Sequence, residues 1–320
     1  MKEKILDLSD PELLGQSRVH ALHSFSSADQ KVYVKREDET GFSISGTKRR
    51  KYASLLPYLE QRGIKEVILM GGEHSNHLPA IIQLLRERGI RFKVCVKKSH
   101  PTAKKGNRFL LHLLIQEEEI EYLDSASWKH AEAYLLDKYG SAAFILPEGA
   151  SCKASLAGAG SLGLDLRRNE EELKLSFSHL FLDAGTGMSA AGMILAQSQL
   201  KHPAHIHVTL MAGEKEEFLQ QLHTYARDWE EIFGEKISEF PPLHLYYPPS
   251  AKSFGSINRE VLKIIREMAL KEGLLLDPIY NAKLFQNAFQ QINEQQLMGN
   301  ICIIHSGGGS GLMGFAEKFA

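Results

Sequence analysis

The chain has 320 residues, of which 43% are hydrophobic and 24% are charged, which is typical of a globular protein with one large or two moderate domains. Its 38 Lys and Arg residues balance 39 Asp and Glu residues, so no global positive charge favours nucleic acid as a partner. No apolar stretch approaches the roughly 20 residues that span a bilayer, and the three cysteines lie far apart and outside any CxxC spacing. We therefore expect a cytoplasmic protein without a membrane segment, a disulfide framework or a thiolate zinc site.

Short apolar runs alternate with longer amphipathic segments, which predicts an α/β fold with a domain boundary near residue 150. Strands are expected at 66–70, 93–96, 120–123 and 143–146, and then at 180–184, 207–211 and 301–304. Helices are expected at 78–88, 108–116 and 128–139. The proline-containing segment 239–250 is expected to be a surface loop.

A glycine-rich turn follows the strand expected at 180–184 and leads into a helix. It contains Gly185-Thr186-Gly187-Met188-Ser189. Glycines let the backbone approach an anion, and the free N–H groups of a helix start are donors for phosphate. The turn has neither the Gly-Lys-Ser/Thr ending of a Walker loop nor the Gly-x-Gly-x-x-Gly spacing of a dinucleotide site. A single phosphate is therefore favoured, and a tight turn without a ligand is the alternative.

Two further strand ends carry polar residues and glycines, and such ends meet at a ligand crevice in open parallel sheets. In the first, Ser75 and Asn76 are expected to cap a helix and to face the crevice, with capping alone as the alternative. His74 and His77 lack a third ligand, so no metal is expected. In the second, the glycines of 305–312 indicate close approach of a flat or anionic group, with a flexible turn as the alternative.

A run of four basic residues, Lys48-Arg49-Arg50-Lys51, follows Gly46 and Thr47. Alone, it allows three interpretations: a nucleic-acid patch, a solvated helix face, or the surroundings of one reactive lysine.

Together, these segments resemble the pyridoxal-phosphate enzymes of the tryptophan-synthase-β fold type, specifically the family of D-cysteine desulfhydrase and 1-aminocyclopropane-1-carboxylate (ACC) deaminase. The matching segments keep their chain order between about residues 30 and 312. They are Val34–Gly41, Gly46–Lys51, Gly71–His77, Pro147–Ser151, Leu276–Lys283 and His305–Gly308.

The resemblance implies two open, twisted and mostly parallel sheet domains with helices on both faces. Residues 1–53 and 155–320 would form a large domain that binds pyridoxal 5′-phosphate, and 54–154 a small α/β domain inserted into it. The implied partner is a small amino-acid substrate, and a homodimer is expected.

The resemblance also implies roles for individual residues. Lys48 corresponds to the lysine that holds the cofactor covalently, with Lys51 as its nearest competitor. An amine must be neutral to attack an aldehyde, and the flanking cations are expected to lower the pKa of Lys48. The residues expected to bind the cofactor are Lys48, Asn76, Gly185, Thr186, Gly187, Met188, Ser189 and Ser306. Ser75, His77 and Tyr280 are expected at the substrate.

The reaction implied is β-elimination from D-cysteine or a related amino acid, with Lys48 or Tyr280 as the base. Ser306, a hydroxyl at the pyridine nitrogen, is expected to leave that nitrogen largely unprotonated. Asn281 replaces the glutamate of ACC deaminases, and Phe254 lies near the position of their second tyrosine, so ring opening is the less favoured alternative. A serine/threonine dehydratase-like enzyme and a non-catalytic phosphate-binding protein are the others.

Thr47 and Pro79 are further departures from the family pattern. They bear on how the substrate carboxylate is bound, and the sequence leaves the physiological substrate and its chirality open.

Overall fold

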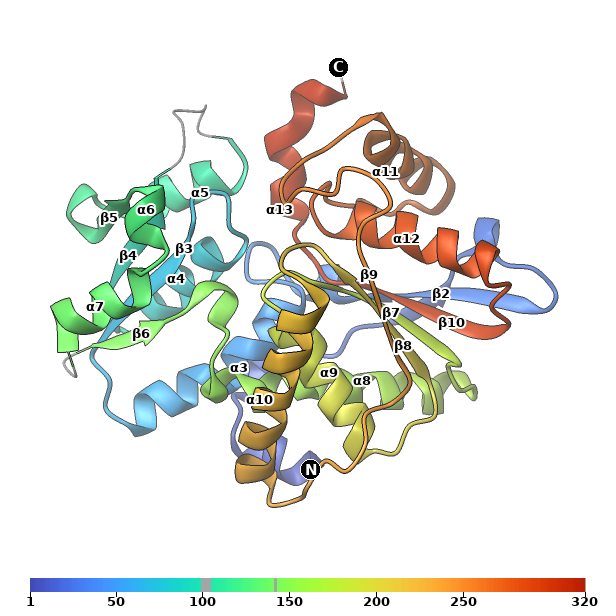
Figure 1. Ribbon diagram of the computed structural model, residues 1–320, viewed down its shortest axis with the longest axis horizontal. Helices are drawn as coiled ribbons and strands as arrows, with labels where there is room; N and C mark the ends of the chain where they lie inside the picture. Colours follow the sequence, from blue (N-terminus) through green and yellow to red (C-terminus); the bar gives the residue numbers. More distant parts are fainter. Residues whose placement is uncertain (99–104, 141–142, 320) are drawn as a thin grey trace.

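The computed structural model describes residues 1–98, 105–140 and 143–319. Figure 1 shows two lobes, each built on its own sheet. The larger sheet has six strands in the order β1-β2-β10-β7-β8-β9, and the smaller has four in the order β5-β4-β3-β6. The prediction of an α/β fold with two mostly parallel sheets is confirmed.

The larger sheet is parallel except for its first strand, which pairs antiparallel with the second. Its strands are β1 (Val19–Ala21), β2 (Gln30–Arg36), β7 (His179–Ala184), β8 (His205–Leu210), β9 (Leu243–Tyr246) and β10 (Gly299–His305). The smaller sheet is entirely parallel. Its strands are β3 (Glu66–Gly72), β4 (Arg91–Lys97), β5 (Ile120–Leu123) and β6 (Phe144–Leu146).

Helices cover both faces of each sheet. Those of the small lobe and of the N-terminal segment are α1 (Lys2–Asp7), α2 (Pro11–Leu14), α3 (Thr47–Gln61), α4 (His77–Glu87), α5 (Asn107–Leu114), α6 (Ser125–Trp128) and α7 (Ala131–Tyr139). Those that follow are α8 (Leu156–Leu173), α9 (Met188–Gln199), α10 (Lys215–Phe233), α11 (Arg259–Glu272), α12 (Asn281–Glu294) and α13 (Gly309–Leu312). The predicted domain boundary at 53/54 falls inside α3, and both boundaries stay predictions.

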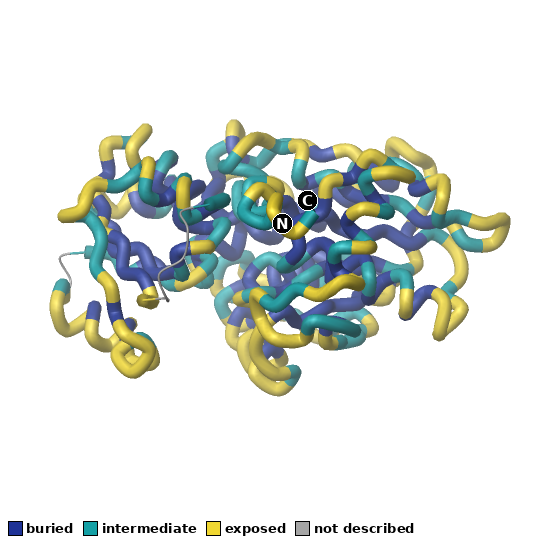
Figure 2. Tube along the Cα trace, turned by 90° about the horizontal axis from the view of Figure 1, so that it is seen from above, coloured by how far each residue is buried: buried dark blue, intermediate teal, exposed yellow. Residues whose placement is uncertain are grey.

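The alternation of side chains along β7 explains the layers of the large lobe. Leu180 and Leu182 pack into a core with α8, α9 and α10, whereas Phe181 packs on the opposite face with α11 and α12. Period-two alternation is what a strand covered on both faces requires. Figure 2 shows the buried trace concentrated in the middle of each lobe. Within the part of the chain that is described, no helix has both the length and the apolar composition of a membrane span.

One expected loop is a strand. Residues 243–246, inside the segment predicted to be a surface loop, form β9 and pair in parallel with β8. The prolines that suggested a loop lie on both sides of this short edge strand, where a missing N–H costs the sheet nothing. Edge position and short length made the strand hard to recognise from the sequence.

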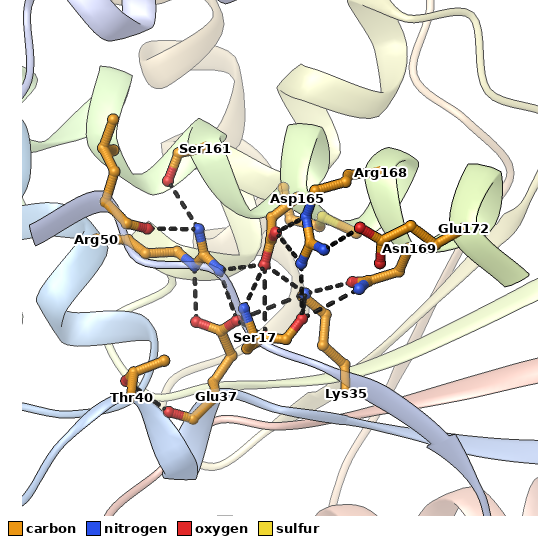
Figure 3. Close-up of polar contacts among 12 residues, drawn as sticks. Ser17, Lys35, Glu37, Thr40, Arg50, Ser161, Asp165, Arg168, Asn169 and Glu172 are labelled. Carbon is orange, nitrogen blue, oxygen red and sulfur yellow. Dashed lines mark hydrogen bonds and ion pairs between the residues drawn. The ribbon is translucent and has the colours of Figure 1, made fainter. Parts of the chain in front are cut away.

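A buried cluster of ion pairs joins β2, α3 and α8 (Figure 3). Arg50 donates two hydrogen bonds of 2.7 Å to the carboxylate of Glu37 and one of 2.6 Å to Asp165. Lys35 donates to the same oxygen of Asp165 at 2.6 Å. Burial alone would raise the pKa of Glu37 and of Asp165, but the neighbouring cations lower both overall. The cluster therefore fixes the first turn of α3 against the large lobe.

Replacing Arg50 with Met should leave two carboxylates buried without their main cation. Loss of one partner of a buried ion pair costs about 3–5 kcal/mol, so the free energy of unfolding should fall by that amount in urea titrations. Arg86→Gln is the matched control, because it breaks the more exposed pair with Glu119, which is worth about 0–1 kcal/mol. Equal small losses in both variants would show that the cluster does not hold α3.

Candidate active site

The start of α3 docks directly on the turn after β10. The N–H of Thr47 donates to the carbonyl oxygen of Ser306 at 3.1 Å. Gly46 has a φ of +70°, and a Cβ added there would lie 2.0 Å from that same oxygen. Only glycine fits such a close approach of two backbones. Lys48, in the first turn of α3, is therefore placed beside the 306–308 turn.

The amine of Lys48 lies within the protein, 5.5 Å from the centre of the Tyr280 ring. Burial lowers its pKa, and the carboxylates of Asp183 and Asp277 oppose that shift. The flanking cations, which we expected to lower the pKa, are engaged elsewhere. Arg49 donates to the carbonyl oxygens of Thr40 and Glu12, and Arg50 belongs to the buried ion cluster.

Asp277 positions Tyr280 at the start of α12. One carboxylate oxygen of Asp277 accepts from the N–H groups of Ile279 and Tyr280, each at 3.0 Å. The Tyr280 ring then lies against Gly185, where an added Cβ would be 3.0 Å from a ring carbon. Burial raises the pKa of the Tyr280 phenol, so the hydroxyl keeps its proton at neutral pH. Phe254 packs edge-on against this ring, with 6.1 Å between ring centres.

The glycine turn after β7 presents the N-terminus of α9. Gly187 has a φ of +83°, and the helix begins at Met188. Met188 is fully buried, so its side chain belongs to the core and only its backbone N–H can serve a ligand. The hydroxyl of Thr186 accepts a hydrogen bond of 2.7 Å from Ser151, and Ser189 lies in the first turn of the helix.

Lys51 lies next to this turn, one helical turn after Lys48. Its amine donates to the carbonyl of Gly149 at 2.6 Å, and a Cβ on Gly149 would lie 2.6 Å from the Thr186 hydroxyl. Burial, followed by repulsion from Lys48, lowers the pKa of Lys51 to about 7. The sequence suggested Lys51 only as a competitor of Lys48, whereas its contacts place it beside the anion-binding turn.

The turn after β3 forms the opposite wall. Ser75 caps α4, as predicted, because its hydroxyl accepts from the N–H of His77 at 3.0 Å. No other hydrogen bond of the Ser75 side chain is recorded among the described residues. Asn76 accepts from Asn107 at 2.5 Å and approaches Gly308, where an added Cβ would lie 3.0 Å from its amide nitrogen.

His77 is buried and held by Tyr52, whose hydroxyl is 2.8 Å from its Nδ1. Its Nε2 atom is buried without a hydrogen-bond partner among the residues described. Burial, then Lys51 and Lys48, lower the pKa of His77 well below its usual value. The imidazole is therefore neutral. Within the described ranges no set of three His, Cys, Asp or Glu side chains could hold a metal ion.

Asp183 is the residue that the sequence interpretation missed. It ends β7 two residues before Gly185, and one of its carboxylate oxygens is buried without a hydrogen-bond partner among the described residues. Burial raises its pKa, whereas Ser306 and Lys48 oppose the rise. An acidic residue at the end of an apolar strand, next to a glycine turn, was the available signal.

A family model described as pyridoxal-phosphate dependent enzyme matches residues 12–307. The chain belongs to this family. Its membership in an enzyme family replaces the alternative of a non-catalytic phosphate-binding protein, and pyridoxal phosphate is its cofactor.

Individual relatives give the same picture. A Pyrococcus horikoshii protein, named as a candidate ACC deaminase, is 30% identical over 90% of this chain and 87% of its own length. A D-cysteine desulfhydrase from Serratia proteamaculans is 24% identical over 89% of each chain. The crystal structure of an ACC deaminase homologue superposes with a TM-score of 0.86 at 26% identity, covering 99% of this chain and 98% of that one.

The side chains of this pyridoxal-phosphate dependent enzyme fit its cofactor. A helix N-terminus with glycines and hydroxyls suits the phosphate, and a buried amine with a lowered pKa suits an aldehyde. Ring-facing glycines at 185 and 308 leave room where a Cβ would collide. Two buried polar atoms, on Asp183 and His77, have no partner among the described residues, and they lie near the same amine.

Proposed function

We propose that this enzyme catalyses β-elimination from a small amino acid, with D-cysteine as the first substrate to test. D-cysteine and water would give a 2-oxo acid, ammonia and hydrogen sulfide. The observation that carries the proposal is the buried amine of Lys48, 5.5 Å from the centre of the Tyr280 ring. The family resemblance of the surrounding turns and the 24% identical D-cysteine desulfhydrase support it.

Lys48 would hold the cofactor covalently, and the N-terminus of α9 with Thr186, Ser189 and Lys51 would hold its phosphate. Asn76 would contact its phenolic oxygen, and Ser306 its ring nitrogen. The cofactor, when bound, supplies an electron sink that weakens the bonds at the substrate Cα. Lys51 adds a cation where the phosphate charge would otherwise meet only neutral donors.

Two residues of the chain can move the protons of the reaction. The Lys48 amine, whose pKa is lowered by burial, can accept a proton near neutral pH. The Tyr280 hydroxyl keeps its proton, because burial raises its pKa, and it can donate that proton to a leaving group. Ser75 and the neutral His77 would bind the substrate carboxylate through their free polar atoms.

Ring opening of ACC is the second candidate, which would place the enzyme among the hydrolases. The 30% identical relative and the superposed ACC deaminase homologue favour it. The position of Asn281 argues for elimination, because its amide is engaged with Asp277 and the backbone of the 306–307 turn. We further propose a homodimer in the cytoplasm, with the large cofactor domain at 1–53 and 155–320 and the small one at 54–154.

Borohydride reduction tests the covalent role of Lys48. The purified protein should show cofactor absorbance, and reduction followed by peptide mass mapping should place the label on Lys48. Lys48→Ala should lose the label. Lys51→Met is the matched control and should keep the label on Lys48 while binding the cofactor more weakly. Label on Lys51, or absence of any label in the cofactor-loaded wild type, would contradict the proposal.

Tyr280→Phe tests the proton donor and separates the candidate reactions. Removing one positioned acid or base lowers a rate by about 10²–10⁴-fold, so turnover of D-cysteine should fall by that factor while cofactor absorbance is retained. Tyr134→Phe, a change on the surface of the small lobe, should leave the rate unchanged. Assays with L-serine, L-threonine and ACC in parallel identify the reaction. Undiminished D-cysteine turnover in Tyr280→Phe would remove Tyr280 from the mechanism.

A further inference from the structure

The amide of Asn281 has a fixed orientation beside Ser306. Its Nδ2 donates two hydrogen bonds of 2.6 Å, to the carboxylate of Asp277 and to the carbonyl of Gly307. Both partners are acceptors, so the nitrogen cannot exchange places with the oxygen. Its Oδ1 therefore faces Ser306, where it accepts from the backbone N–H at 2.9 Å and lies 3.5 Å from the hydroxyl.

Asp183 is the second acceptor beside the Ser306 hydroxyl. A hydrogen bond from Ser306 lowers the pKa of this carboxyl, and Lys48 acts in the same direction. The other carboxylate oxygen is buried and has no hydrogen-bond partner within the described residues. An ionised carboxylate in such surroundings needs a nearby positive charge.

The hydrogen of the Ser306 hydroxyl has acceptors on the protein side, at Asn281 and Asp183. A serine hydroxyl carries one donor and two acceptor lone pairs. Once the hydrogen is given to the protein, Ser306 can offer only lone pairs to a ligand. The group that faces Ser306 must then be a hydrogen-bond donor.

We propose that Asp183 and Asn281 orient the Ser306 hydroxyl so that its oxygen accepts a hydrogen bond from a protonated ring nitrogen of the cofactor. The proposal rests on the proposed function, which puts Ser306 opposite that nitrogen. It replaces the expectation from the sequence that a hydroxyl at this position leaves the nitrogen unprotonated. Asp183 is a positioning residue here, because it acts through Ser306.

The charges around Asp183 agree with this arrangement. Lys48 and Lys51 from α3 are attracted to Asp183, and Asp277 and the Tyr280 phenol lie on the other side. Burial raises the pKa of Asp183, and a cation at the ring nitrogen is the charge that would lower it again. Carboxylate and ring nitrogen would stabilise each other's charged forms.

A protonated ring withdraws more electron density from the substrate Cα than a neutral ring does. The site would then suit substrates whose bond at Cα is hard to break, in addition to substrates with a good leaving group on Cβ. The carboxylate that ACC deaminases supply from the position of Asn281 would come here from β7, through Ser306.

The test is the nitrogen-15 NMR shift of the ring nitrogen in holoenzyme reconstituted with ring-labelled pyridoxal phosphate. At neutral pH the wild-type signal should fall in the range of a pyridinium. A wild-type signal in the range of an unprotonated pyridine overturns the proposal without any variant.

Variants then assign the cause. Asp183→Asn and Ser306→Ala should each move the signal toward unprotonated pyridine, and Asp183→Glu should restore part of the shift. Thr209→Val is the matched control, since Thr209 is the register partner of Asp183 on β8 and bonds to Asn287 instead; it should leave the signal in place. An unchanged signal in Asp183→Asn removes Asp183 from the role.

The two proposals fail differently. If borohydride fixes no cofactor on Lys48, the proposed function fails. If the cofactor is fixed on Lys48 and the substrate is turned over while the ring nitrogen is unprotonated, only this inference fails.

Discussion

The contact between the start of α3 and the turn after β10 is the constraint on which the site depends. It brings Lys48 to Ser306, although the two residues are far apart in the sequence. A side chain at Gly46 would push the two backbones apart. The other side of the same helical turn is held by Arg50, whose ion pairs with Glu37 and Asp165 are buried. Lys48 is thus positioned from both sides of its helix.

This constraint also explains the run of four basic residues. Each side chain has its own surroundings: Arg49 binds backbone carbonyls, Arg50 joins the buried ion cluster, and Lys51 lies beside the turn before α9. Lys48 alone points toward the Tyr280 ring. The run is neither a solvated helix face nor a patch for nucleic acid. A helix places neighbouring residues about 100° apart, so consecutive positive charges face different parts of the protein.

The fold and most of the candidate site could be predicted from the sequence, since apolar strands and glycine turns are local signals. Contacts between distant residues could not. Lys35 looks like an exposed charge on a strand, yet it is fully buried because Asp165, 130 positions later, pairs with it. Asp183 gave no signal through a motif, because its importance comes from the segments that surround it. The short edge strand β9 lacked the length on which a pattern depends.

The most direct test of this account is a crystal structure of the enzyme grown with pyridoxal phosphate. The account predicts continuous electron density from the Lys48 amine to the cofactor, with the phosphate at the N-terminus of α9 and the ring nitrogen beside Ser306. Density that joins the cofactor to Lys51, or a phosphate bound away from the 185–189 turn, would contradict it.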